Sequence, residues 1–171
     1  YDLRVADVGD APLSTRYHLA ECHADIEAWI GAMVRQGVAP LTVGGDHSMT
    51  HPILRALGKD RPVGMIHIDA HSDTGGPFDG QKFHHGGPFR NAVLDGVLDP
   101  TRVVQIGLRG PAEYMYEFAT DSGMTCIHAE DVDTMGIPAI IAKARRPIFR
   151  STSTAWTRCS RPAPAPPKSA G

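Results

Sequence analysis

Short apolar runs alternate with amphipathic stretches along most of the chain, and this alternation constrains the fold more than any other feature. Five apolar runs are predicted as strands: Leu3–Val8, Pro40–Val43, Val63–Ile68, Val103–Leu108 and Thr125–His128. Stretches with helical spacing lie between or after them: His18–Gln36, Met49–Leu57, Pro88–Leu94, Ala112–Asp121 and Ile137–Ala144. Strands that alternate with helices form parallel sheets with both faces covered. The predicted fold class is therefore α/β, a three-layer α/β/α arrangement with a mostly parallel sheet.

The last part of the sequence breaks this pattern. Residues 150–171 have no apolar periodicity and are rich in Pro, Ala and Ser, so we expect a disordered tail there. Residues 1–149 are predicted to form one domain, because their length suits a single hydrophobic core. The sequence opens with Tyr1 rather than Met, so we expect it to start inside a longer reading frame or after processing.

Composition excludes several classes of protein. The formal net charge is −2, which does not fit the basic face of a nucleic-acid-binding protein. No apolar run is long enough to cross a membrane, and no signal peptide opens the sequence. The three cysteines are few and widely spaced, so they predict neither a disulfide framework nor a zinc ribbon. We expect reduced thiols and a cytoplasmic location.

Two predicted strands end in residues that bind metals. The first is followed by Gly44-Gly45-Asp46-His47-Ser48 and the second by Asp69-Ala70-His71-Ser72-Asp73. Parallel strands present their carboxyl ends at one edge of the sheet, where ligands bind. In extended chain, alternate side chains point the same way, so the second motif directs its Asp, His and Asp to one point. Carboxylate and imidazole ligands without thiolate favour manganese. Several carboxylates indicate two cations, which together lower the pKa of a shared water.

These motifs resemble those of the ureohydrolase family, which includes arginase, agmatinase, guanidinobutyrase and guanidinopropionase. The resemblance covers residues 5–146. Four segments carry it: Leu41–Ser48, His67–Asp73, Phe83–Phe89 and Val104–Gly110. Residues 1–149 are thereby identified as a partial arginase-like ureohydrolase domain. Histone deacetylases share the general fold but arrange their ligands differently, and another metal-dependent C–N hydrolase of this fold is an alternative.

The resemblance implies a role for each site residue. His47 and Asp73 would ligate one Mn²⁺, His71 would ligate the other, and Asp69 would bridge the two. His85 would shuttle protons to the amine leaving group, with His84 as a competing candidate. His51, His67 and His128 are expected to have structural or solvent-facing roles.

The implied reaction is manganese-dependent hydrolysis of a small guanidino compound to urea and an amine. Arginases carry an Asn after the Asp-x-His-x-Asp motif where Gly75 stands here, and they carry a serine near the position of Gln81. Their absence favours agmatine or a guanidino acid over arginine. Arg90 is a candidate for pairing with a substrate carboxylate, although a surface or helix-stabilising role is the simpler interpretation. Family members assemble as homo-oligomers, which the resemblance implies here only for a complete domain.

A complete family site also needs a Phe-Asp-x-Asp motif followed by Ser-Leu-Asp-Pro, which the printed sequence lacks. With permitted codons, residues 150–157 read one frame away give Phe-Asp-Ile-Asp-Ser-Leu-Asp, and continuing the reading gives Pro next. We therefore expect residues 150–171 to be the product of a frameshift. The alternative to an active enzyme is an inactive, truncated ureohydrolase remnant with an incomplete metal site. On either interpretation we expect weak metal binding and little turnover from this chain alone.

Overall fold

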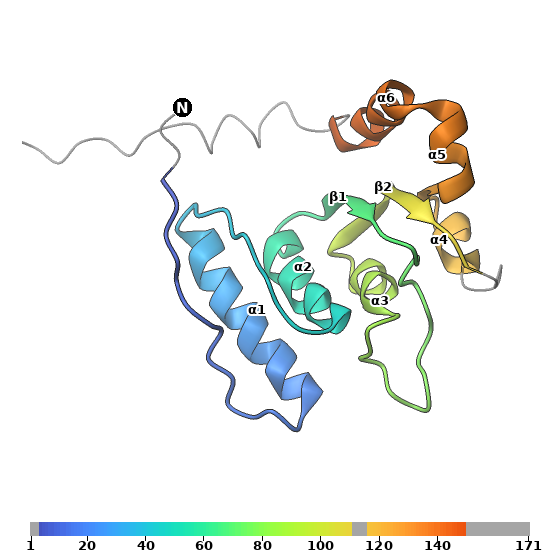
Figure 1. Ribbon diagram of the computed structural model, residues 1–171. Helices are drawn as coiled ribbons and strands as arrows, with labels where there is room; N and C mark the ends of the chain where they lie inside the picture. Colours follow the sequence, from blue (N-terminus) through green and yellow to red (C-terminus); the bar gives the residue numbers. More distant parts are fainter. Residues whose placement is uncertain (1–3, 111–115, 150–171) are drawn as a thin grey trace, which may run out of the picture.

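The computed structural model describes residues 4–110 and 116–149. The elements follow one another in the order α1 (Leu19–Arg35), η1 (His47–Met49), α2 (Thr50–Gly58), β1 (Val63–Ile68), α3 (Pro88–Leu94), β2 (Leu98–Leu108), α4 (Glu117–Asp121), β3 (Thr125–His128), α5 (Ala129–Met135) and α6 (Ile137–Phe149). Figure 1 labels the six α-helices and strands β1 and β2 along the chain. The element η1 is a single turn of 3₁₀-helix before α2.

The three strands form one parallel sheet in the order β1-β2-β3. Helices cover both faces, as predicted: α2 and α3 lie on one side in Figure 1, and α5 and α6 on the other. Neighbouring residues of β2 serve the two faces, since side chains alternate along a strand. Val103 packs with Leu54 and Phe89, whereas Val104 packs with Ile127 and Ile140. The three-layer α/β/α class is therefore confirmed.

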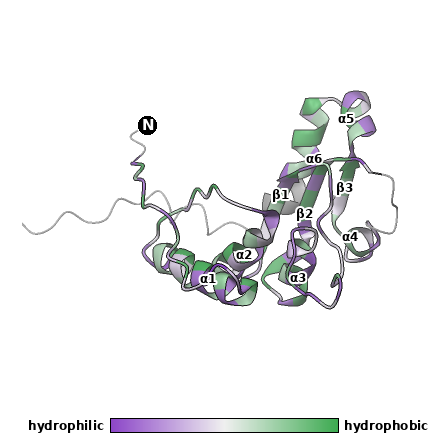
Figure 2. Ribbon diagram, turned by 60° about the horizontal axis from the view of Figure 1, so that its bottom comes forward, coloured by the Kyte–Doolittle hydropathy of each residue, from purple (hydrophilic) through white to green (hydrophobic). Residues whose placement is uncertain are grey.

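Helix α1 adds an outer layer on α2 rather than on the sheet. Ile30 on α1 and Ile53 on α2 are the buried centre of this contact. Figure 2 shows hydrophobic and hydrophilic residues interleaved along both helices, as the helical spacing predicted. The predicted stop at Gly37 is also confirmed, because Gly37 follows the helix with a φ of +76° that suits glycine.

Two predicted strands do not form in the described part of the chain. Residues 4–8 of the predicted strand Leu3–Val8 have no regular structure, and Leu3 lies outside the described residues. Pro40–Val43 is also irregular, with Leu41 91% and Val43 94% exposed. A strand persists only when a neighbour satisfies its backbone groups. Among the described residues neither segment pairs with the sheet, so apolar character alone does not hold them extended.

The remaining boundaries agree closely with prediction, with three differences. Strand β2 begins five residues before the predicted Val103, α6 extends beyond Ala144, and the short helix α5 was not predicted. The first residues of the predicted helix Ala112–Asp121, and the predicted tail 150–171, lie outside the described residues. Within those residues, no helix is both long and apolar enough to cross a membrane.

Candidate metal centre

The candidate centre lies where β1 ends at the carboxyl edge of the sheet. Asp69 directly follows β1, and its backbone N–H donates to the carbonyl of Ile106 at 3.1 Å. Arg109, which directly follows β2, donates its backbone N–H to the carbonyl of Ala70 at 2.8 Å. The loop that carries the Asp-Ala-His-Ser-Asp motif is therefore held by backbone hydrogen bonds on both sides of Gly107.

Gly107 makes this arrangement possible. Its φ of +91° lies in the region that favours glycine, and the pairing of β2 with β3 shifts register between Ile106 and Leu108. A Cβ at this position would lie 3.5 Å from the carbonyl oxygen of Asp69. The irregularity thus redirects the end of β2 against the metal-binding loop.

Four side chains converge at this edge: His47, His67, Asp69 and Asp73. Each offers one nitrogen or oxygen atom, and these atoms all lie within 4.8 Å of one another. The donors are imidazole and carboxylate groups without thiolate, which is the set that manganese or a similar divalent cation prefers. The residues therefore fit the cation that the sequence predicted.

His47 and Asp73 are in direct contact, Nδ1 of the imidazole to Oδ2 of the carboxylate. His47 reaches the site from η1, which Asp46 caps by accepting a 2.7 Å hydrogen bond from the backbone N–H of Ser48. The pKa of Asp46 is lowered chiefly by a hydrogen bond from the side chain of Ser48; burial opposes the shift, and the backbone N–H of Ser48 and the nearby His85 also favour the charged form. Asp46 therefore shapes the turn that presents His47.

Asp73 has an unusual backbone for a non-glycine residue, with a φ of +50°. Its carbonyl accepts from the backbone N–H of Phe89 at 3.2 Å, which joins the loop to the first turn of α3. An aspartate in the left-handed backbone conformation costs conformational energy, which surrounding contacts must offset. The contacts to His47 and Phe89 are two such contacts.

The Asp69 carboxylate is fixed by its own loop. Its Oδ1 accepts a 2.9 Å hydrogen bond from the backbone N–H of His71. Burial disfavours the charged form, but this bond and the nearby histidines outweigh it and lower the pKa of Asp69. The carboxylate is thus kept ionised and available to a cation.

The His71 side chain lies beside the four-residue group rather than within it. It is 63% exposed, and its Nδ1 is 3.6 Å from Oδ1 of Asp69. This separation places it at the solvent side of the Asp69 carboxylate. Its assignment to a second cation remains a prediction.

His67 is the member of the cluster that sequence reasoning missed, since it was assigned a structural or solvent-facing role. It is buried on β1, two residues before Asp69, and therefore points to the same face of the extended chain. The alternation used for residues 69, 71 and 73 would have found it if extended backwards. Burial lowers the pKa of His67, although Asp69 and Asp73 oppose the shift.

The two loop histidines have different environments. His84 is partly buried, and its Nε2 contacts the carbonyl oxygen of Gly76 at 2.8 Å. His85 is exposed and makes no hydrogen bond among those found in the described residues. The loop is closed by a 2.8 Å bond from the N–H of Gly75 to the carbonyl of Gly86. His84 therefore stabilises the loop, while His85 is left accessible.

Arg90 packs against α4 and does not belong to the cluster. Its guanidinium carbon lies 4.4 Å from the centroid of the Phe118 ring, a cation–π distance. This contact supports the helix-stabilising interpretation over pairing with a substrate.

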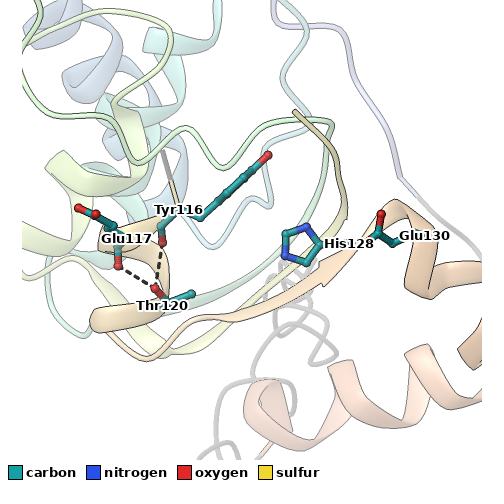
Figure 3. A pocket seen from close by; sticks show the side chains of 5 residues that line it. All are labelled: Tyr116, Glu117, Thr120, His128 and Glu130. Carbon is teal, nitrogen blue, oxygen red and sulfur yellow. Dashed lines mark hydrogen bonds between the residues drawn. The ribbon is translucent and has the colours of Figure 1, made fainter. Parts of the chain in front are cut away.

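A separate pocket opens beyond the carboxyl end of β3 (Figure 3). Its lining residues are Tyr116, Glu117, Thr120, His128 and Glu130. Thr120 donates its hydroxyl within α4, to the carbonyls of Tyr116 and Glu117. The ring of His128 lies 5.5 Å from that of Tyr116. None of these residues belongs to the metal cluster.

Comparison with known proteins gives consistent matches. The sequence model of the arginase family matches residues 1–157. Guanidinopropionase from Pseudomonas aeruginosa is 46% identical over 150 residues, which are 85% of this chain and 47% of the relative. Mitochondrial agmatinase from Gallus gallus is 42% identical over 147 residues, covering 84% of this chain and 43% of the relative.

The solved structures include one of comparable similarity. Proclavaminate amidino hydrolase from Streptomyces clavuligerus superimposes with a TM-score of 0.72 at 31% identity, covering 78% of this chain and 45% of that chain. The chain therefore spans somewhat less than half the length of these relatives.

Proposed function

The chain belongs to the arginase family, and we propose that its histidine–aspartate cluster is part of a manganese centre that hydrolyses a guanidino compound to urea and an amine. The observation that supports this most directly is the convergence of His47, Asp69 and Asp73 from two loops at one sheet edge. Charged groups that fold together in this way add little to stability compared with apolar residues of similar size, so a cation ligand set explains their convergence better than packing does.

The family resemblance supplies the assignment of roles. His47 and Asp73 would hold one cation, His71 would hold the other, and Asp69 would contribute its carboxylate to both. Bound cations of this kind supply a hydroxide at neutral pH and stabilise negative charge. Asp69 remains ionised because its loop stabilises the charge. His85 gives a proton to the departing amine, which requires an imidazole that substrate can reach.

The proposed substrate is agmatine or a guanidino acid rather than arginine. Any side chain at Gly75 would bring a Cβ within 2.9 Å of the carbonyl oxygen of Gly86. The loop as folded therefore has no room for the asparagine that arginases place there. Relatives named guanidinopropionase and agmatinase match this chain at 46% and 42% identity.

The chain as printed supplies only part of the proposed centre. A two-metal site needs further carboxylates, which the family provides in a later strand. We propose that this chain alone binds Mn²⁺ weakly and turns over little or no substrate. An inactive remnant of a ureohydrolase is the second candidate, and urea release by the unaltered chain distinguishes the two.

The expected setting is a reducing compartment such as the cytoplasm. Cys22 and Cys126 are free thiols, and neither belongs to the metal cluster. Homo-oligomerisation is expected by family resemblance for a complete domain.

A chimera tests the function directly. Residues 1–149 would replace the matching segment of the Pseudomonas guanidinopropionase, and urea would be measured from guanidinopropionate, guanidinobutyrate, agmatine and arginine. We expect manganese-dependent urea release, with arginine the poorest substrate. A folded, manganese-loaded chimera that releases no urea from any of them would refute the proposal. The unaltered chain, assayed in parallel, should release little urea, and robust turnover would refute its incompleteness.

A further inference from the structure

The strongest unexplained feature is a buried polar pair beneath the metal cluster. His67 on β1 and Gln105 on β2 are register partners in the parallel sheet, so their side chains lie together on one face. Their exposed fractions are 8% and 0%. The Gln105 Nε2 atom lies 3.5 Å from Nδ1 of His67. Polar groups this deeply buried destabilise a fold unless they have hydrogen-bond partners. Packing of the core therefore does not explain why His67 and Gln105 are polar.

Gln105 has a fixed orientation. Its Nε2 donates to the carbonyl oxygen of Ser72 at 2.6 Å, and its Oε1 faces the thiol of Cys126 at 3.8 Å. A carbonyl only accepts hydrogen bonds, so the group that faces Ser72 is the NH₂ of the amide. Gln105 therefore ties the Asp-Ala-His-Ser-Asp loop to the middle of β2.

This orientation determines where the His67 proton lies. The same NH₂ group faces Nδ1 of His67, so Nδ1 must accept, and in the neutral ring the proton is on Nε2. That Nε2 is buried and has no hydrogen-bond partner in the described part of the chain. It lies 3.6 Å from Oδ2 of Asp69.

Aromatic packing holds the imidazole in this position. The ring centroid of His67 lies 4.6 Å from that of Phe89 and 5.5 Å from that of His47. The Asp69 carboxylate is held at its other oxygen by the N–H of His71. A small rotation of the Asp69 side chain would bring Oδ2 within hydrogen-bond distance of Nε2–H.

We propose that Gln105 and His67 are positioning residues: Gln105 fixes the Nε2–H tautomer of His67, and Nε2–H holds the Asp69 carboxylate in the orientation that binds cations. The inference rests on the proposed metal centre and concerns two residues to which the family resemblance assigns no metal-binding or catalytic role. Partners of this kind orient ligands and affect metal affinity by about 10- to 100-fold. The alternative, in which His67 is itself a ligand, requires a lone pair on Nε2 and therefore the opposite tautomer.

Two substitutions of His67 separate positioning from packing. His67→Gln keeps an N–H near the position of Nε2 but removes the ring, whereas His67→Phe keeps a ring and removes the nitrogen. Mn²⁺ affinity of the full chain would be measured by electron paramagnetic resonance of free Mn²⁺, with thermal unfolding as the check on folding. We expect His67→Phe to weaken binding about 10- to 100-fold and His67→Gln to remain close to the unaltered chain. The reverse order, or no effect of either, would overturn the proposal.

The tautomer itself provides a readout that needs no metal. Nitrogen-15 NMR of the metal-free chain should find the His67 proton on Nε2. Gln105→Met, which removes the amide at similar volume, should shift the proton towards Nδ1 and weaken Mn²⁺ binding. A proton on Nδ1 in the unaltered chain would overturn the proposal and make His67 a ligand. If the unaltered chain binds no Mn²⁺, the proposed centre fails and the pair has nothing to position. If Mn²⁺ binds the unaltered chain and neither His67→Phe nor Gln105→Met weakens that binding, the positioning role of the pair is refuted while the metal centre stands.

Discussion

His47 and Asp73 touch side chain to side chain although 26 residues separate them in the sequence. One comes from a 3₁₀ turn after an irregular segment, and the other lies in the loop between β1 and α3. Their contact closes the metal cluster on the side of α3, because Phe89 packs on the ring of His47 and donates its N–H to Asp73. The two metal-binding loops therefore depend on each other at this point.

Asp73→Asn should abolish most manganese binding. The substitution removes the charge but keeps a residue that tolerates the left-handed backbone. We expect Mn²⁺ affinity to fall by about 100-fold or more, which exceeds the loss expected when a residue that only orients a ligand is replaced. The unfolding midpoint should change little. Asp79 has a similar φ of +47° but is exposed and outside the cluster. Asp79→Asn is therefore the matched control, and equal losses in the two variants would contradict a specific role for Asp73.

Gly107→Ala should reduce both stability and metal affinity. A left-handed backbone costs a non-glycine residue about 1–2 kcal/mol, and the added Cβ contacts the carbonyl of Asp69. Gly80 has a φ of +73°, and a Cβ added there would meet nothing within 4 Å. Gly80→Ala should show a comparable loss of unfolding free energy in urea but unchanged Mn²⁺ affinity. If Gly107→Ala also leaves affinity unchanged, the end of β2 does not position the loop.

The sequence predicted β1 and β3 to the residue, because both are short apolar runs bounded by clear turn signals. It was wrong about Pro40–Val43, which carries the same apolar signature. A strand needs a hydrogen-bonding neighbour as well as apolar side chains, and that requirement is non-local. Leu41 and Val43 are residue types that favour strands, but no strand among the described residues forms hydrogen bonds with them.

The site was predictable where its residues form a local motif. Asp69 and Asp73 are both in the four-residue cluster, and His47 joins them from the Gly44–Ser48 motif. His67 was missed because it lies inside a strand, where a histidine more often fills space. Its pairing with Gln105 depends on strand register, which the sequence does not specify. The left-handed Asp73 and the bulge at Gly107 likewise follow from tertiary contacts.

Acidification should destabilise the fold through His23. Burial lowers the pKa of His23 to about 4, with His51 and Arg55 adding to the shift and Asp46 opposing it. In the unfolded chain His23 therefore binds a proton below about pH 6.5, whereas in the folded chain it binds one only below about pH 4. Stability contributed by the neutral ring is complete above that window and is lost as the pH falls through it, by about 3 kcal/mol.

Urea unfolding of two variants between pH 7 and pH 4 checks this prediction. His23→Gln cannot titrate, so its unfolding free energy should fall less steeply with decreasing pH. His18 is exposed, and His18→Gln should retain the full loss. Part of the loss will remain in both variants because the pKa values of His51 and His67 are also lowered by burial. Parallel profiles for the two variants would exclude His23 as the main acid-sensitive group.

His85→Asn should separate catalysis from metal binding. In the guanidinopropionase chimera we expect a rate loss of about 10²- to 10⁴-fold without a change in Mn²⁺ affinity, because His85 is outside the cluster. His84→Asn should instead lower the unfolding midpoint, since His84 contacts the carbonyl of Gly76 within the loop. A larger rate loss at His84 than at His85 would exchange their roles.

The coding DNA of residues 150–171 should contain the missing motif one frame away. We expect codons for Arg150 to Thr157 that read Phe-Asp-Ile-Asp-Ser-Leu-Asp in the shifted frame, and codons incompatible with that reading would refute it. A physical consequence follows, because two aspartates spaced by two on an extended chain point to the same side. A chain in which the shifted reading replaces residues 150–171 should therefore bind Mn²⁺ more tightly than the printed chain. The same replacement with both aspartates of Phe-Asp-Ile-Asp changed to asparagine should not, since an amide oxygen carries no charge to offset a second cation.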